Sequence, residues 1–98
     1  LEPWDPKLTP IYLKEKYHKK NIPIKTVLLD QSIITGIGNI YADEICYATS
    51  INPKRSGDKV SKNDCARIIE ASCKILNDAI NDLKEIMNIP DNYKIIFV

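Results

Sequence analysis

Features that mark a membrane protein, a secreted protein or a zinc protein are absent from this sequence of 98 residues. No apolar run approaches the length needed to span a bilayer, and no signal-peptide pattern is present. The three cysteines, Cys46, Cys65 and Cys73, are an odd number without C-x-x-C spacing. We therefore expect neither a disulfide framework nor a metal site, and a reducing intracellular compartment.

Aromatic residues and net charge are also scarce. The chain is 7% aromatic, 44% hydrophobic and 28% charged, which predicts one folded domain with a small core. The net charge of +1 hides an asymmetry, because six lysines and a single acid, Glu15, lie between Pro6 and Leu29. A lysine-rich helix is usually a solvated face, so this pattern is compatible with phosphate binding without indicating it.

The first half of the chain predicts three helices. Thr9 and Pro10 are a typical N-cap and first helical residue, and the helix they begin should run to about Lys20. A short helix follows from Ile24 to Asp30, and residues 31–38 form a two-turn connection. Asn39 can cap a third helix that reaches about Thr49. The residues expected on the apolar sides of the first two helices are Ile11, Tyr12 and Tyr17, then Val27, Leu28 and Leu29. In the third helix, Ile40, Tyr41, Ile45 and Ala48 are expected on or near the buried side.

The second half predicts a loop at residues 52–58 and one long helix. Ser61 and Asp64 resemble a capping box at its start, and it should end near Asn88, before Pro90. Its apolar residues recur at helical spacing: Cys65, Ile68, Ile69, Cys73, Leu76, Ile80, Leu83 and Met87. We expect residues 1–8 to be a linker from an upstream domain, and residues 91–98 to begin a segment that continues elsewhere.

The pair Gly36-x-Gly38 at the start of the third helix is the best candidate site. Two glycines allow a bulky anion to approach, and the free N–H groups of Gly38, Asn39 and Ile40 would donate to it. The Asn39 amide would add a directed bond, and Lys25 could supply a cation. The alternative is that the glycines only make a tight turn and that Asn39 only caps a helix.

A longer string surrounds these glycines. Leu28-Leu29-Asp30-Gln31, followed by Gly36-Ile37-Gly38-Asn39-Ile40-Tyr41-Ala42-Asp43-Glu44, closely resembles the helix–two-turn–helix (H2TH) domain of the formamidopyrimidine-DNA glycosylase and endonuclease VIII family. The resemblance continues through Ile51-Asn52-Pro53 and Ser61 to the long helix. It implies an all-α bundle of about four helices over residues 9–90, with an extended C-terminal segment.

The resemblance also implies a function, namely the repair of oxidised bases in DNA. Such proteins excise 8-oxoguanine and formamidopyrimidines and then cleave the abasic site by β/δ-elimination. The family's phosphate contacts fall on Lys25 and Asn39, and its turn amides on Gly38 and Ile40. The implied partner is damaged double-stranded DNA. The implied location is the nucleus in a eukaryote, or the cytoplasm and nucleoid in a bacterium.

Two parts of the family pattern have no counterpart here. The nucleophilic N-terminal proline and the glutamate that follows it belong to an N-terminal domain, so we expect no catalytic residue in this chain and a missing catalytic domain as its partner. The bacterial zinc finger is also absent, and we expect no cofactor here. Residues 89–97 are more similar to the zincless branch of plants and fungi.

Two other functions compete with this interpretation. Ribosomal small-subunit proteins also use a helix–two-turn–helix with a Gly-Ile-Gly turn, so an RNA-binding module is one alternative. Those proteins carry more Arg and Lys and lack the continuation after Asn39. The other alternative is an interaction domain in which the glycine turn is purely structural.

Overall fold

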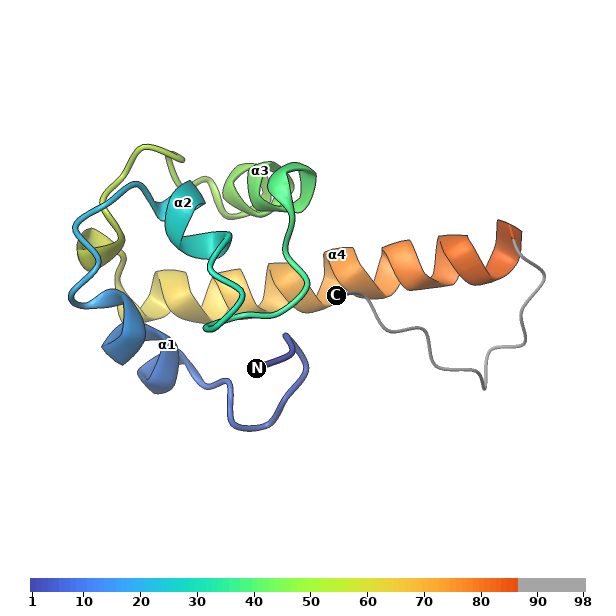
Figure 1. Cartoon of the computed structure of the whole chain (residues 1–98), viewed down its shortest axis with the longest axis horizontal. Helices are drawn as coiled ribbons and strands as arrows, with labels where there is room; N and C mark the ends of the chain where they lie inside the picture. Colours follow the sequence, from blue (N-terminus) through green and yellow to red (C-terminus); the bar gives the residue numbers. More distant parts are fainter. Residues whose placement is uncertain (87–98) are drawn as a thin grey trace.

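Helices make up the regular structure over residues 1–86. The computed structural model describes residues 1–86, and the arrangement is shown in Figure 1. The elements are α1 (Pro10–Tyr17), α2 (Ile24–Leu28), α3 (Asn39–Thr49), the short 3-10 helix η1 (Gly57–Lys59) and α4 (Lys62–Ile86). Within this range there is no strand, only an isolated bridge between Pro23 and Ser56. The predicted all-α fold is confirmed, while the predicted C-terminal segment lies outside the described residues.

Helix α1 begins where the sequence predicts. The Thr9 hydroxyl accepts a hydrogen bond from the Tyr12 N–H at 3.1 Å, and Pro10 is the first helical residue. The helix ends at Tyr17, earlier than expected. Leu13 and Tyr17, four residues apart, form its buried face. Ile11 is 57% exposed, so its predicted burial is wrong: it lies about 200° around the helix from Leu13.

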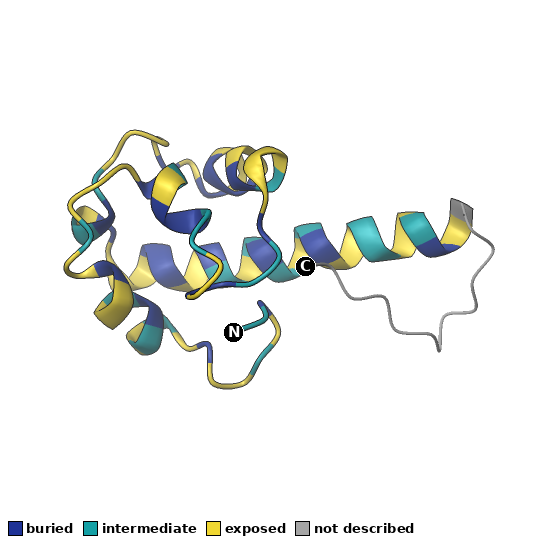
Figure 2. Cartoon of the chain, in the orientation of Figure 1, coloured by how far each residue is buried: buried dark blue, intermediate teal, exposed yellow. Residues whose placement is uncertain are grey.

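Helix α4 is the longest helix, and both α1 and α3 pack against it, while α2 packs against α3. Its predicted capping box is confirmed, because the Ser61 hydroxyl accepts from the Asp64 N–H at 3.0 Å and the Asp64 carboxylate accepts from the Ser61 N–H at 3.1 Å. In Figure 2 most buried residues of α4 lie in its first half, which is the part beside α1 and α3. The second half extends past the bundle. Of the predicted apolar set, Cys65, Ile68 and Leu76 are buried, Ile69, Cys73, Ile80 and Leu83 are half-buried, and Met87 lies outside the described range.

Arg67 fastens the C-terminal end of α3 to the first turns of α4. Its guanidinium donates to the Thr49 carbonyl at 2.9 Å and pairs with the Asp64 carboxylate. Arg55 adds a second ion pair to Asp64 at 3.6 Å. These contacts fix the direction of α3, whose N-terminal end therefore points away from the start of α4.

Residues 1–8 lie against the bundle. Pro3 and Leu8 are buried, and the Leu1 carbonyl accepts a hydrogen bond from the Thr35 N–H at 2.7 Å. The expectation that this segment connects to an upstream domain stays a prediction. None of the helices over residues 1–86 has the length and apolar character that crossing a membrane requires.

Candidate nucleic-acid interface

The connection between α2 and α3 is held together by its own side chains. The Gln31 amide nitrogen donates to the Ile37 carbonyl at 2.8 Å and to the Leu29 carbonyl at 3.2 Å, while its oxygen accepts from the Gly36 N–H at 2.8 Å. Asp30 accepts from the Ser32 N–H at 3.0 Å. Buried Ile33, Ile34 and Ile37 anchor the same segment in the core. The turn is therefore a fixed structure. Sequence reasoning gave Gln31 no role.

The two glycines of the turn serve different purposes. Gly36 has a φ of 97°, which L side chains rarely adopt, so the turn itself requires glycine there. Gly38 is extended, with φ −95° and ψ −177°. A Cβ built on Gly38 would meet nothing within 4 Å. Nothing in the described fold therefore requires glycine at Gly38, and its missing side chain leaves open space in front of α3.

The start of α3 carries free hydrogen-bond donors. Gly38 is the N-cap and makes no side-chain cap, whereas Asn39 is the first helical residue. The prediction that Asn39 caps the helix is therefore wrong, because Gly38 already occupies that position. The N–H groups of Gly38, Asn39 and Ile40 have no acceptor within residues 1–86, and neither has the exposed Asn39 amide a partner there. These groups face solvent where the helix dipole favours an anion.

The buried face of α3 differs from the predicted one. Ala42, Ile45, Cys46 and Thr49 are buried, at helical spacing. Ile40 is 73% exposed and Ala48 is exposed as well, so their predicted burial is wrong. Ile40 therefore lies on the open side of the turn, next to the free amides.

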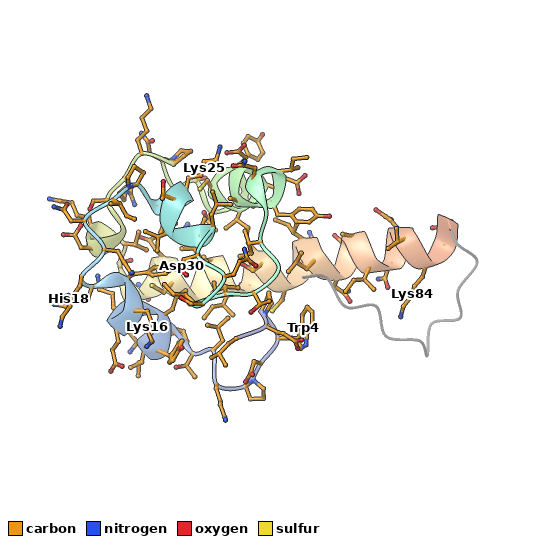
Figure 3. All side chains as sticks on the ribbon, viewed as in Figure 1. Trp4, Lys16, His18, Lys25, Asp30 and Lys84 are labelled. Carbon is orange, nitrogen blue, oxygen red and sulfur yellow. The ribbon has the colours of Figure 1, made fainter. Side chains whose placement is uncertain are left out.

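Lys25 lies beside this helix start. Its N–H donates to the Pro53 carbonyl at 3.2 Å, which fixes the beginning of α2. Its ammonium is 2.9 Å from the Asp43 carboxylate, and the two side chains are 35% and 57% exposed. Asp43 follows Asn39 by one helical turn on the same face, about 6 Å along the axis. The fold thus brings the lysine, seen beside α2 in Figure 3, to the helix that carries the free amides.

The other candidate groups lack the properties of reactive sites. Burial raises the pKa of the Cys65 thiol to about 11, and burial also raises the pKa values of Cys46 and Cys73, so these thiols are neutral. His18 lies at the exposed end of α1 (Figure 3). Over residues 1–86, no three His, Cys, Asp or Glu side chains are close enough to hold a metal ion.

Two helices joined by a glycine turn, with free amides at the start of the second helix and a lysine nearby, form the arrangement expected of a helix–two-turn–helix domain. The sequence model of the formamidopyrimidine-DNA glycosylase H2TH domain matches residues 1–91. The chain therefore belongs to this family, and the resemblance noted in the sequence is confirmed. The finer prediction of the zincless branch rests on residues 89–97, outside the described range, and stays a prediction.

Individual relatives agree with the family model. Formamidopyrimidine-DNA glycosylase of Bacillus cereus is 43% identical over 79 residues, covering 81% of this chain and 29% of that protein. The Synechococcus protein of the same name is 36% identical over 99 residues, covering 94% of this chain and 35% of that protein. This chain thus spans about a third of the length of the curated relatives it matches.

Solved structures show the same arrangement of helices. The Lactococcus lactis Fpg, in a complex with DNA containing an abasic site, superposes with a TM-score of 0.74 at 28% identity, covering 82% of this chain and 30% of that one. The MutM (Fpg) protein of Thermus thermophilus gives a TM-score of 0.76 at 27% identity, covering 83% of this chain and 30% of that one.

Proposed function

We propose that this chain is the DNA-binding H2TH domain of a base-excision-repair DNA glycosylase and AP lyase, and that it holds the sugar-phosphate backbone of damaged DNA. The observation that carries the proposal is the open start of α3. Three amides without acceptors in the described structure, an extended glycine with free space around it and an exposed carboxamide converge there, with Lys25 alongside.

Each component of this site suits a phosphate oxygen. Helix N–H groups and an amide nitrogen donate to anions, and the ammonium of Lys25 adds a charge. None of these contacts reads a base edge, so the domain would fix the position of the duplex while another part of the protein selects the lesion. The extrahelical nucleotide would be processed in that other part.

The enzymatic activity is proposed for the whole protein. Relatives named formamidopyrimidine-DNA glycosylase support removal of oxidised purines, although this chain covers only 29% of the Bacillus cereus protein. The family resemblance implies that the proline nucleophile and the glutamate belong to an N-terminal domain, so the contribution proposed for this chain is binding. A repair role also places the protein with the chromosome, inside the cell.

Two variants test the proposed contacts. Lys25→Ala should weaken binding to a duplex containing an abasic-site analogue and reduce the slope of log K against log salt, by less than one because Asp43 already neutralises part of the lysine's charge. Asn39→Ala should weaken binding about tenfold, because a hydrogen bond to a charged group is lost. Both side chains are at least partly exposed, so thermal unfolding should change little. Fluorescence anisotropy between about 50 and 200 mM salt provides the measurement.

The matched control is Lys62→Ala, which removes the same charge at the exposed first residue of α4. It should leave affinity nearly unchanged. Equal losses of affinity in Lys25→Ala and Lys62→Ala would show that Lys25 acts only through general attraction between positive charge and DNA, and would contradict the proposed site. Tighter binding of ribosomal RNA fragments in a competition assay would favour an RNA-binding module, and no binding to either nucleic acid at low salt would favour a structural one.

A further inference from the structure

The Lys25–Asp43 ion pair places an anion beside the proposed phosphate site. The ammonium and carboxylate are 2.9 Å apart, and both side chains remain partly exposed. Asp43 has the geometry of an internal counter-ion, since its carboxylate pairs with the ammonium of Lys25. An incoming phosphate must share Lys25 with this carboxylate or displace it.

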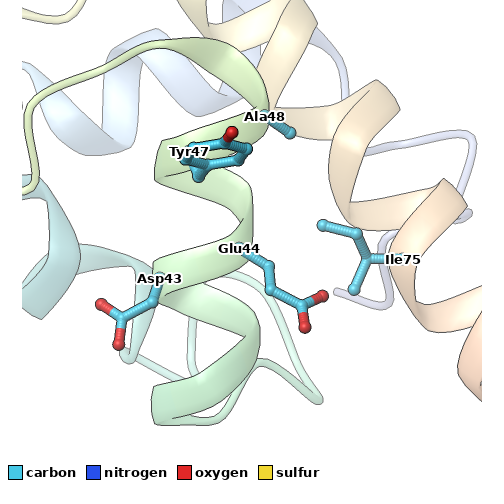
Figure 4. Close-up of a pocket in the computed structure, with 5 residues that line it drawn as sticks. All are labelled: Asp43, Glu44, Tyr47, Ala48 and Ile75. Atoms are coloured by element: carbon cyan, nitrogen blue, oxygen red, sulfur yellow. The ribbon is translucent and has the colours of Figure 1, made fainter.

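The next residue on α3 offers a natural comparison. Figure 4 shows Asp43 and Glu44 directed to different sides of α3, with Glu44 turned toward Ile75 of α4. Glu44 has no ion pair within the described residues, and its side chain is exposed. The two acids therefore carry the same charge on the same helical turn, but only Asp43 contacts Lys25.

We propose that Asp43 competes with the DNA phosphate for Lys25. Its carboxylate positions the lysine side chain before DNA binds, and it weakens the binding of the DNA backbone afterwards. The inference rests on the function proposed above and adds a second charge to the site. When a phosphate contacts Lys25, the lysine exchanges its ion pair with Asp43 for an ion pair with the phosphate. The net gain in binding free energy from Lys25 is therefore small.

The exchange has a direct consequence for rates. Surface ion pairs are weak and are screened by salt, so the carboxylate can replace the phosphate as readily as the phosphate replaces it. Variation in affinity within one interface lies mostly in the dissociation rate. Asp43 should therefore speed release of the backbone. An enzyme that searches DNA for damage must dissociate from many undamaged sites, so fast release of the DNA backbone is an advantage.

The test is Asp43→Asn, which keeps the shape of the side chain and removes its charge. In the full chain, binding to a fluorescent duplex with an abasic-site analogue should tighten about threefold to tenfold at low salt. The dissociation rate measured by stopped-flow competition should fall by most of that factor. The salt slope should steepen by up to about one, because Lys25 becomes a free cation. Thermal unfolding should stay within about 3 °C of the wild type.

Three controls make the result specific. Glu44→Gln should change affinity less than about twofold, since Glu44 lies on the other side of the helix. In a Lys25→Ala background, Asp43→Asn should lose most of its effect, because the competition requires the lysine. Persistence of the full effect without Lys25, an equal effect of Glu44→Gln, or weaker binding by Asp43→Asn would each overturn the proposal. In each of these outcomes the wild-type chain still binds the duplex. If the wild-type chain does not bind the duplex at all, the proposed function itself is wrong, and so is the role of Asp43.

Discussion

Gly38→Ser separates what the fold needs at the start of α3 from what a bound phosphate needs. Gly38 is the N-cap, with an extended backbone that any residue adopts. Serine is at least as good an N-cap as glycine, since its hydroxyl accepts from an N–H in the first turn. The substitution should therefore leave stability unchanged or raise it by a few tenths of a kcal/mol, about 1–3 °C in Tm.

The same substitution should damage binding. Apart from the two adjoining residues, no atom of the described chain lies within 4 Å of a Cβ built on Gly38, and this is the space proposed for the phosphate. The serine hydroxyl would also occupy one of the free amide donors. Loss of one hydrogen bond to a charged oxygen costs about 1.5–3 kcal/mol, or roughly tenfold to a hundredfold in Kd. Thermal unfolding and fluorescence anisotropy on the same samples would measure both effects.

Gly57→Ser is the matched control, because it should behave in the opposite way. A Cβ at Gly57 would lie 3.0 Å from both the Lys20 carbonyl and a Val27 methyl, so the backbone must shift. We expect a loss of about 1–3 kcal/mol in stability with unchanged affinity of the folded fraction. Wild-type affinity in Gly38→Ser would refute the proposed position of the phosphate. Affinity that simply follows stability in both variants would show that the glycines act through folding alone.

Two further predictions concern the core and its edge. Burial alone would raise the pKa of Asp64, but hydrogen bonds from Arg67 and Ser61 outweigh it, so the pKa of the folded carboxyl lies below its ordinary value. Its stabilising effect should then be complete above about pH 4 and disappear as pH falls through the folded pKa. Asp64→Asn should cost about 1–3 kcal/mol in urea unfolding at neutral pH, and the cost should shrink as the pH falls from about 4 through the folded pKa; a cost independent of pH would contradict this. The Tyr17 hydroxyl is buried without a hydrogen-bond partner in the described structure, so Tyr17→Phe should be neutral or stabilising by up to about 1 kcal/mol in thermal unfolding, and a clear loss would contradict this.

Local chemistry explains which parts of the fold could be predicted from sequence. Thr9 with Pro10, and Ser61 with Asp64, satisfy backbone groups within four residues of themselves, so the starts of α1 and α4 are readable. The 25 residues of α4 also repeat the apolar spacing often enough to define one face. The eight residues of α1 do not, and Ile11 was placed on the wrong side.

The site was predictable only in part. The glycine string identified the turn and the residues around it, because that string is specific to one family. The partner of Lys25 could not be predicted, since Asp43 lies in another helix and its contact depends on how α2 and α3 pack. The role of Gln31 was missed for a similar reason: its three hydrogen bonds depend on the path of the whole turn.

The bridging of the turn by Gln31 has a consequence for the energetics of association. The Gln31 side-chain amide joins the beginning of the turn to Gly36 and Ile37 at its end. The backbone N–H groups at the start of α3 are therefore already oriented in the unliganded protein. The conformational entropy of arranging them is lost during folding, so little of it is lost again when a ligand arrives. Glutamate at this position would keep an acceptor for Gly36 but offer no donor to Ile37. The start of α3 would then keep the same number of N–H donors, but their orientation would be less fixed. Binding an anion would require the turn to become ordered at the same time.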